Sequence, residues 1–216
     1  MEKRIISITG TSFFYVKTDF VRIQFDVRVV RKIYEKALSE LTEKVNSIIG
    51  IIINNGFNKN NLKTSNFDIQ KETKYDSKKQ ESYFIGYRAT ENLSISFEID
   101  NKKISSILND IWKMISDVDF NVSFYCSNPN TYENQLIELA VKDAKEKAEL
   151  ITKAVGVKLL KITKIDYSFS EIHIENTFDY EFSPKEICCE SSINMPEMDP
   201  EDTKLKKSIN IEWEIE

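Results

Sequence analysis

The sequence predicts an α+β fold: an antiparallel sheet built on a split βαβ core, with a third, alanine-striped helix and C-terminal strands added to it. Two observations carry this prediction. Segments with an apolar residue at every second position alternate with segments whose apolar residues recur every three or four positions, the signatures of half-buried strands and amphipathic helices. Over about residues 19–127 their order is strand, helix, strand, strand, helix, strand, which is the order of the split βαβ motif.

The chain begins with two predicted strands. Residues 5–10 form a short strand that ends at Gly10, and a longer strand follows over about residues 19–30. In the longer strand, apolar side chains alternate with Arg, Gln and Asp at Val21, Ile23, Phe25, Val27 and Val29. This period of two predicts that one face of the strand is buried.

The middle of the chain supplies two helices and three further strands. From Arg31 onward the apolar residues recur at steps of four and three, which predicts a helix that ends at Gly56 in a left-handed conformation. Strands over about 62–75 and 83–99 follow, joined by a charged turn. A second helix over about 102–117, with Asn101 as its N-cap, precedes a strand marked by Phe120, Val122 and Phe124.

The third helix has the clearest boundaries. Asn130 and Glu133 resemble a capping box at its start, and Gly156 follows its last apolar residue. A stripe of Ala140, Ala144 and Ala148 allows the helix to lie close to its neighbour. The sequence also predicts three ion pairs at four-residue spacing, namely Glu138–Lys142, Asp143–Lys147 and Glu149–Lys153. Two strands follow, over about 159–169 and around 209–215.

The residues that punctuate these elements resemble the SIMPL domain family in order and spacing. They are Ile8-Thr9-Gly10, Gly56, Thr64, Gly86-Tyr87-Arg88-Ala89-Thr90, Phe124, the three alanines, Gly156 and Leu159. The resemblance implies one SIMPL-like α+β domain over residues 1–216, and oligomers by analogy with bacterial members. It implies no reaction, because the family has no agreed catalytic residues. Many members carry a leader for export that this sequence lacks, and Leu160 replaces a glycine common in the family.

Composition and charge exclude several classes of protein. The 216 residues include 30 Lys and Arg against 35 Asp and Glu, a net charge of −5, so we expect no nucleic-acid partner that binds through phosphate neutralisation. No apolar run is long enough for a membrane span or a leader peptide. Three cysteines cannot form a disulfide framework, so we expect a reducing, cytoplasmic location.

The residue types needed for common catalytic and metal sites are scarce. His173 is the only histidine, and we therefore expect neither a His-based triad nor a multi-histidine metal site. Cys126, Cys188 and Cys189 lack Cys-x-x-Cys spacing, and the five glycines stand too far apart for a phosphate loop. We therefore expect no catalytic residues, no metal site and no cofactor, and we expect that the protein is not an enzyme.

The candidate functional residues lie in an aromatic stretch that alternates with polar residues. They are Tyr167, Phe169, Ile172, Ile174, Phe178, Tyr180 and Phe182. With a turn at Glu175-Asn176-Thr177, this stretch is either an exposed hairpin that meets another subunit or an extra sheet packed on the protein's own core. It overlaps an acidic segment over 171–202, which holds ten acids and one base for a net charge of −9, against +4 elsewhere.

The sequence is compatible with two functions. The preferred one is a non-catalytic scaffold or interaction module that self-associates, in which the segment 171–202 folds back on the body or meets its copy. The alternative is a small-molecule-binding protein or enzyme with a pocket between the sheet and the third helix, where Ala140, Ala144 and Ala148 leave space.

Overall fold

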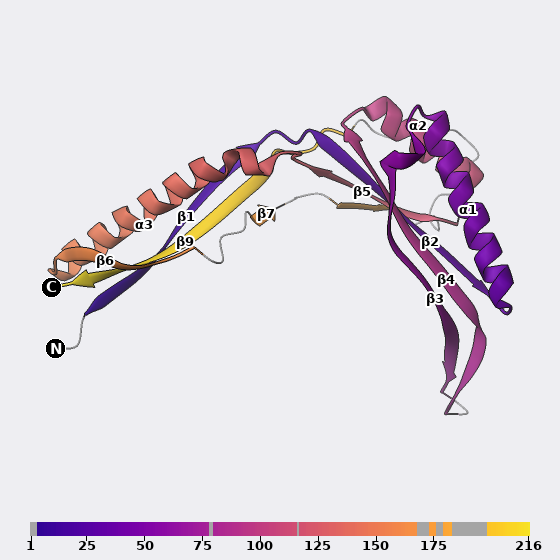
Figure 1. The fold of residues 1–216 in the computed structure, drawn as a ribbon, viewed down its shortest axis with the longest axis horizontal. Coiled ribbons are helices and arrows are strands. Elements are labelled where there is room, and N and C mark those ends of the chain that lie inside the picture. The colour runs from indigo at the N-terminus through magenta and orange to yellow at the C-terminus, as the bar shows by residue number, and fades with distance from the viewer. Residues whose placement is uncertain (1–3, 78–79, 116, 168–172, 176–178, 183–197) are drawn as a thin grey trace. The chain divides into compact units, whose positions relative to one another are not determined.

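The computed structural model (Figure 1) describes residues 4–77, 80–115, 117–167, 173–175, 179–182 and 198–216. The chain forms two compact units. The terminal unit comprises Met1–Thr18, Cys126–Thr177 and Glu201–Glu216, and the central unit comprises Asp19–Tyr125 and Phe178–Pro200. The single domain predicted over 1–216 is thus made of two units with a sheet each. Apolar alternation predicts strands, but it does not say which strands share a sheet.

The central unit confirms the split βαβ prediction. Its sheet has the order β3-β4-β2-β5-β8, and every neighbouring pair is antiparallel. The elements in chain order are β2 (Phe20–Arg31), α1 (Tyr34–Asn54), the 3-10 turn Lys59–Asn61, β3 (Leu62–Asp76), β4 (Glu81–Glu98), α2 (Asn101–Met114), β5 (Asp119–Tyr125) and β8 (Asp179–Phe182).

One hydrophobic core holds the central unit together. The alternating side chains of β2 are buried as predicted, and they pack against α1 and α2. Helix α1 contributes Leu41, Val45, Ile48, Ile51 and Ile52, spaced so that they lie on one face. The N-cap of α2 differs from the prediction by one residue, because the Asp100 carboxylate accepts hydrogen bonds from the backbone N–H groups of Lys102 and Lys103.

The terminal unit consists of a sheet covered on one face by a long helix. Its strands have the order β1-β9-β6, all antiparallel, and a short strand, β7, also pairs with β9. The elements are β1 (Ile5–Val16), the 3-10 turn Pro129–Tyr132, α3 (Glu133–Val155), β6 (Leu159–Asp166), β7 (His173–Glu175) and β9 (Thr203–Ile215). The prediction ended strand β1 too early, because apolar and polar residues do not alternate in the sequence of its second half.

Helix α3 lies directly on β1, as the alanine stripe predicted. Ala140, Ala144 and Ala148 are fully buried. A Cβ atom on Gly10 of β1 would overlap the carbonyl oxygen of Ala140 and lie 2.7 Å from the Cβ of Ala144. The glycine and the alanines therefore allow a contact between helix and strand backbones that any larger side chain would prevent.

The two ends of α3 differ in how well the sequence predicted them. Gly156 adopts a left-handed conformation with φ of 74° at the C-terminal end, which confirms the prediction. The capping box at the start is wrong: Asn130 lies inside a 3-10 turn, and the N-cap is Tyr132, whose side chain makes no capping bond. Of the three predicted ion pairs, Asp143–Lys147 is present, while the described structure pairs Lys142 with Glu146 and Lys145 with Glu149.

Candidate functional site

Among the described residues, the predicted aromatic interface does not form a hairpin. Strand β7, which contains Ile174, pairs with β9 in the terminal unit. Strand β8, which contains Tyr180 and Phe182, pairs with β5 in the central unit. The hairpin prediction is therefore wrong, because these two strands have different neighbours. Tyr167 is described and half exposed, whereas Phe169, Ile172 and Phe178 lie outside the described residues.

The acidic segment 171–202 folds back on the body in its described parts. Strands β7 and β8 each extend one of the two sheets. Near the end of the segment, Met198 is buried in the core of the central unit. Its backbone carbonyl accepts a hydrogen bond of 3.1 Å from the Asn101 side chain, and its N–H donates to the same side chain at 3.4 Å. The first of the two alternatives for this segment is thus confirmed for these residues.

Tyr167 takes part in a polar cluster of the terminal unit. The ammonium of Lys207 on β9 lies 2.7 Å from the Glu133 carboxylate at the start of α3. The Tyr167 hydroxyl donates to the same carboxylate at 3.2 Å, and the Lys207 ammonium lies 5.1 Å from the centre of the Tyr167 ring. The cluster therefore connects α3, β9 and the chain just after β6.

Lys207 is the central residue of this cluster and is closed to ligands. Its side chain faces α3 in phase with Leu205 and Ile209, and only 1% of the residue is exposed. Burial of an ammonium is costly unless it is paired. Glu133 supplies the charge that pairs with it, so the cluster stabilises the unit and the Lys207 amine is not accessible as a nucleophile. The hydrogen bond from Lys207, its positive charge and the hydrogen bond from Tyr167 hold the pKa of the Glu133 carboxyl below its usual value.

Low pH is expected to weaken this cluster. Because the folded-state pKa of Glu133 is below its ordinary value of 4.5, ionised Glu133 stabilises the fold above that pH. The stabilisation disappears as the pH falls through the folded-state value. Glu133→Gln should therefore lower the urea midpoint at about pH 7, and the difference from wild type should shrink toward about pH 3. Urea unfolding of both proteins across this range checks the prediction; a difference independent of pH would contradict it.

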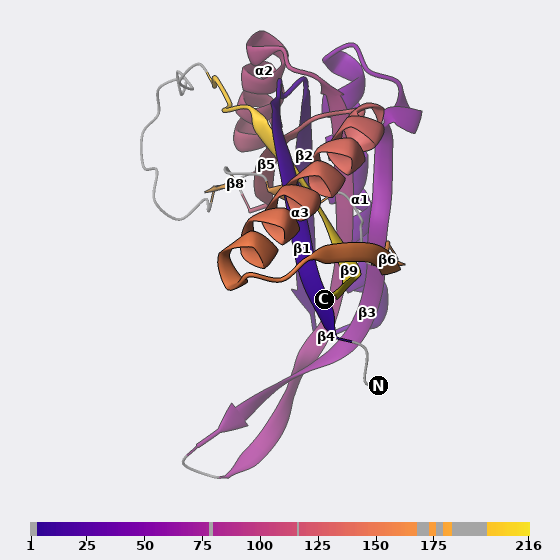
Figure 2. The ribbon, with the colours of Figure 1, turned by 90° about the vertical axis from the view of Figure 1, so that its left-hand side faces the viewer.

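The second candidate feature is a two-stranded ribbon in the central unit, which we call the aromatic arm (residues 72–76 of β3 and 81–86 of β4). Strand β2 pairs with β4 only from Tyr87 onward, whereas β3 and β4 remain paired as far as Asp76 and Glu81. The two strands therefore continue past the end of β2, as Figure 2 shows. A two-stranded ribbon has little stability by itself in water.

Large aromatic side chains cover the aromatic arm. Tyr75 is 62% exposed, Phe84 50% and Tyr83 51%. Phe84 is opposite Thr73 and Tyr75 is opposite Ser82, so Phe84 and Tyr75 lie on one face of the ribbon and Tyr83 lies on the other. Exposed aromatic side chains gathered on one element are typical of a surface that contacts another molecule.

The base of the aromatic arm is fixed by close contacts. The rings of Phe84 and Tyr87 meet edge to face at 5.3 Å, and Tyr87 meets Tyr34 of α1 at 5.7 Å in the same way. Gly86 permits the close approach of β4 to the end of β2, because a Cβ at this position would lie 2.5 Å from the carbonyl oxygen of Arg31. The arm is thus anchored to the helix and to the last residue of β2.

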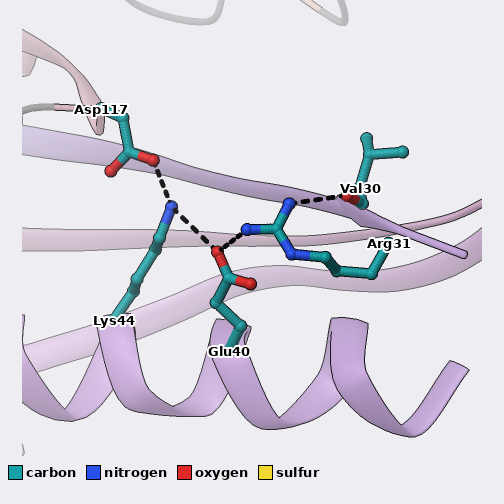
Figure 3. A network of polar contacts seen from close by, with 5 residues as sticks. All are labelled: Val30, Arg31, Glu40, Lys44 and Asp117. Atoms are coloured by element: carbon teal, nitrogen blue, oxygen red, sulfur yellow. Dashed lines mark hydrogen bonds and ion pairs between the residues drawn. The ribbon is translucent and has the colours of Figure 1, made fainter. Parts of the chain in front are cut away.

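A series of ion pairs connects the same end of β2 to α1 and to Asp117, which lies between α2 and β5 (Figure 3). Arg31 donates to the Val30 carbonyl at 2.8 Å and lies 2.5 Å from the Glu40 carboxylate of α1. Lys44 bridges Glu40 at 3.9 Å and Asp117 at 2.5 Å. These charged side chains are paired with one another at the surface. They therefore hold the base of the aromatic arm in place, and none of the three ion-paired residues of the network, Arg31, Glu40 and Lys44, is left without a partner.

Within the described ranges, no group of three or more His, Cys, Asp or Glu side chains could hold a metal ion. Cys126 is free and buried among apolar side chains, as expected of a small apolar residue. No helix in the described part of the chain is long and apolar enough to cross a membrane.

Comparison with known proteins identifies a family and a relative. A family model named SIMPL, with the description "Protein of unknown function (DUF541)", matches residues 6–213 and so includes residues of both units. The protein named "Uncharacterized protein YggE" from Edwardsiella ictaluri (strain 93-146) is 23% identical over 168 residues, which cover 77% of this chain and 69% of that protein.

Proposed function

This chain belongs to the SIMPL family, whose description assigns no activity, and we propose that it works as a non-catalytic interaction module that associates with copies of itself. The observation that carries the proposal is the aromatic arm. Its ribbon continues beyond the sheet and exposes Tyr75 and Phe84 on one face. Covering these rings with a second molecule would remove apolar surface from water and support a ribbon that is weak alone.

The alternative, a pocket for a small molecule beneath α3, has no support where it was predicted. Ala140 and Ala144 lie against Gly10 so closely that one added methyl group would overlap the helix backbone. Close packing, the other consequence of small residues, is what the terminal unit uses. Non-catalytic action remains part of our proposal, as does the lack of a nucleic-acid partner.

Replacing the two rings on one face of the aromatic arm tests the proposal. Tyr75→Ser combined with Phe84→Ser is expected to raise the dissociation constant for self-association at least about tenfold, because each buried ring contributes more than about 1 kcal/mol. Met114→Ser is the matched control, since Met114 is an exposed apolar residue of the same unit on α2. Sedimentation velocity over a concentration series gives the constants. Equal effects of the control and the arm variant, or no effect of either, would count against the arm.

A further inference from the structure

Strand β1 lies at an edge of the terminal sheet. In the order β1-β9-β6, only one side of β1 is paired, and no strand among the described residues pairs with its outer side. Its twelve residues, Ile5–Val16, include no charged residue and no proline. Such an edge presents backbone N–H and C=O groups that another strand can pair with.

The other edge strands carry the usual protection against strand addition. Strand β6 has two lysines and an aspartate, and its pairing with β9 contains two register shifts. Strand β3 has six charged residues, and β8 is only four residues long, two of them acidic. Inward-pointing charges, bulges and short length all discourage pairing between chains. Strand β1 alone among these edges lacks each of these features.

Two hydrogen bonds show which backbone groups of β1 face outward. The Arg4 carbonyl accepts from the Ile215 N–H on β9, so the even-numbered residues bond to β9. In an antiparallel pair the alternate residues direct both groups away from the partner strand. The Thr11 N–H confirms this phase, because it donates to the Asp143 carboxylate of α3 at 2.7 Å. Ile5, Ser7 and Thr9 therefore present their N–H and C=O groups at the outer edge.

Asp143 limits how far along β1 an added strand can pair. Its carboxylate occupies the outward N–H of Thr11 and is held by Lys147 at 2.6 Å. These two bonds also hold the pKa of the Asp143 carboxyl below its usual value, so the group is ionised at neutral pH. The open stretch is thus Ile5–Thr9, with a basic residue, Arg4, at one end and an acidic group beside Thr11 at the other.

We propose that Ile5–Thr9 pairs antiparallel with the same stretch of a second copy, about a two-fold axis at Ser7. The inference rests on the proposed self-association and names one contact through which it occurs. In this register Ile5 lies opposite Thr9 of the second copy, and the pairing adds about six backbone hydrogen bonds. Arg4 falls opposite Gly10, on the sheet face that α3 covers, and so beside Asp143 of the other copy. The opposite charges meet twice, once on each side of the axis.

Helix α3 adds apolar surface to the same edge. Leu150 is 69% exposed and lies on the same side of α3 as Asp143 and Lys147, seven and three residues earlier. Because Leu136 contacts Ser12 while Ala144 contacts Gly10, the helix runs toward the start of β1 as its residue number rises. Leu150 therefore flanks the open stretch Ile5–Thr9, where the two-fold axis would bring two copies of it together.

Substitutions at Ser7 test the pairing without breaking the backbone hydrogen bonds between β1 and β9. Ser7→Pro removes an outward N–H and leaves the bonds between β1 and β9 intact. Ser7→Ala is its matched control, because both variants lose the bond from the Ser7 hydroxyl to Asn210 and only the proline variant loses the N–H. Ser7→Lys keeps the N–H but places two like charges at the axis, which disfavours pairing. Arg4→Glu places a carboxylate beside Asp143 of the other copy, so that two negative charges face each other.

Sedimentation velocity, with circular dichroism to establish folding, separates the outcomes. We expect wild type and Ser7→Ala to have the same mass, and Ser7→Pro and Ser7→Lys to have about half of it at the same concentration. Arg4→Glu should lower the mass at low salt. If wild type associates and the Ser7→Pro and Ser7→Lys variants have the same mass as wild type, this contact is wrong and the proposed function stands. Equal losses in Ser7→Ala and Ser7→Pro also overturn this contact, and a monomeric wild type overturns both proposals.

Discussion

Gly10→Ala is expected to destabilise the terminal unit by about 3 kcal/mol, the upper range for adding a methyl group to a packed core. The added Cβ would overlap the Ala140 carbonyl oxygen and crowd Ala144. Both contacts involve the helix backbone or an alanine, which has no side-chain rotamer to change. Helix α3 would have to move away from β1, and the contact of all three alanines with the sheet would loosen.

Gly50→Ala is the matched control for this substitution. Gly50 lies inside α1 with no atom within 4 Å of an added Cβ, so the alanine should stabilise the central unit by about 1 kcal/mol through helix propensity. Trp213 is buried in the terminal unit. The sequence has two tryptophans, Trp112 and Trp213, so the substitution Trp112→Phe leaves Trp213 as the single tryptophan. Its fluorescence during urea unfolding therefore reports on the terminal unit. An unchanged midpoint for Gly10→Ala would contradict the close contact of α3 and β1.

The second large effect is expected at Lys207. Lys207→Ala removes a fully buried side chain and leaves a cavity beneath α3, which should cost about 3 kcal/mol. Lys207→Met fills nearly the same volume without a charge, and Glu133 keeps its exposure to water. Because replacing a buried ion pair with an apolar side chain is often neutral, Lys207→Met should lie within about 1 kcal/mol of wild type.

Urea unfolding followed through Trp213 compares the two Lys207 variants. The prediction requires that the alanine variant be much less stable than the methionine variant. If the two are destabilised equally, the charge of Lys207 is what the unit needs, and the interpretation of Lys207 as a packed side chain that Glu133 neutralises is wrong.

The elements of the central unit follow from the sequence because local pattern and burial agree there. The alternation from Val21 to Val29 and the helical spacing from Leu41 to Ile52 each describe one buried face, and all of these residues lie in one core. The split βαβ order then leaves few arrangements of four strands. The stripe of Ala140, Ala144 and Ala148 was equally informative, because close packing is what small residues on one helix face permit.

Strand partners in the rest of the chain are not a local property, and there the predictions failed. The alternation from Tyr167 to Phe182 predicts strands, but β7 and β8 find partners in different sheets, in β9 and β5. Strand β1 pairs with β9 at the opposite end of the sequence. The capping box at Asn130 failed because Pro129 begins a 3-10 turn, which places Asn130 inside the turn.

The sequence contains a signal for each of the two features of the candidate site, although neither feature was predicted from it. Lys207 stands in phase with Leu205, Ile209 and Ile211, so extending the last strand toward its start would have placed a lysine in the core. The aromatic arm is visible as two strands that are several residues longer than β2, with Tyr75, Tyr83 and Phe84 near the turn. Their exposure depends on where β2 ends, which the sequence of β3 and β4 does not contain.

The mass of the unmodified chain in solution is a direct measure of self-association. Sedimentation equilibrium from low to tens of micromolar chain measures it without any substitution. Self-association predicts a mass that rises with concentration to at least twice that of the 25.2 kDa chain. A single species of 25.2 kDa over the whole range would contradict it.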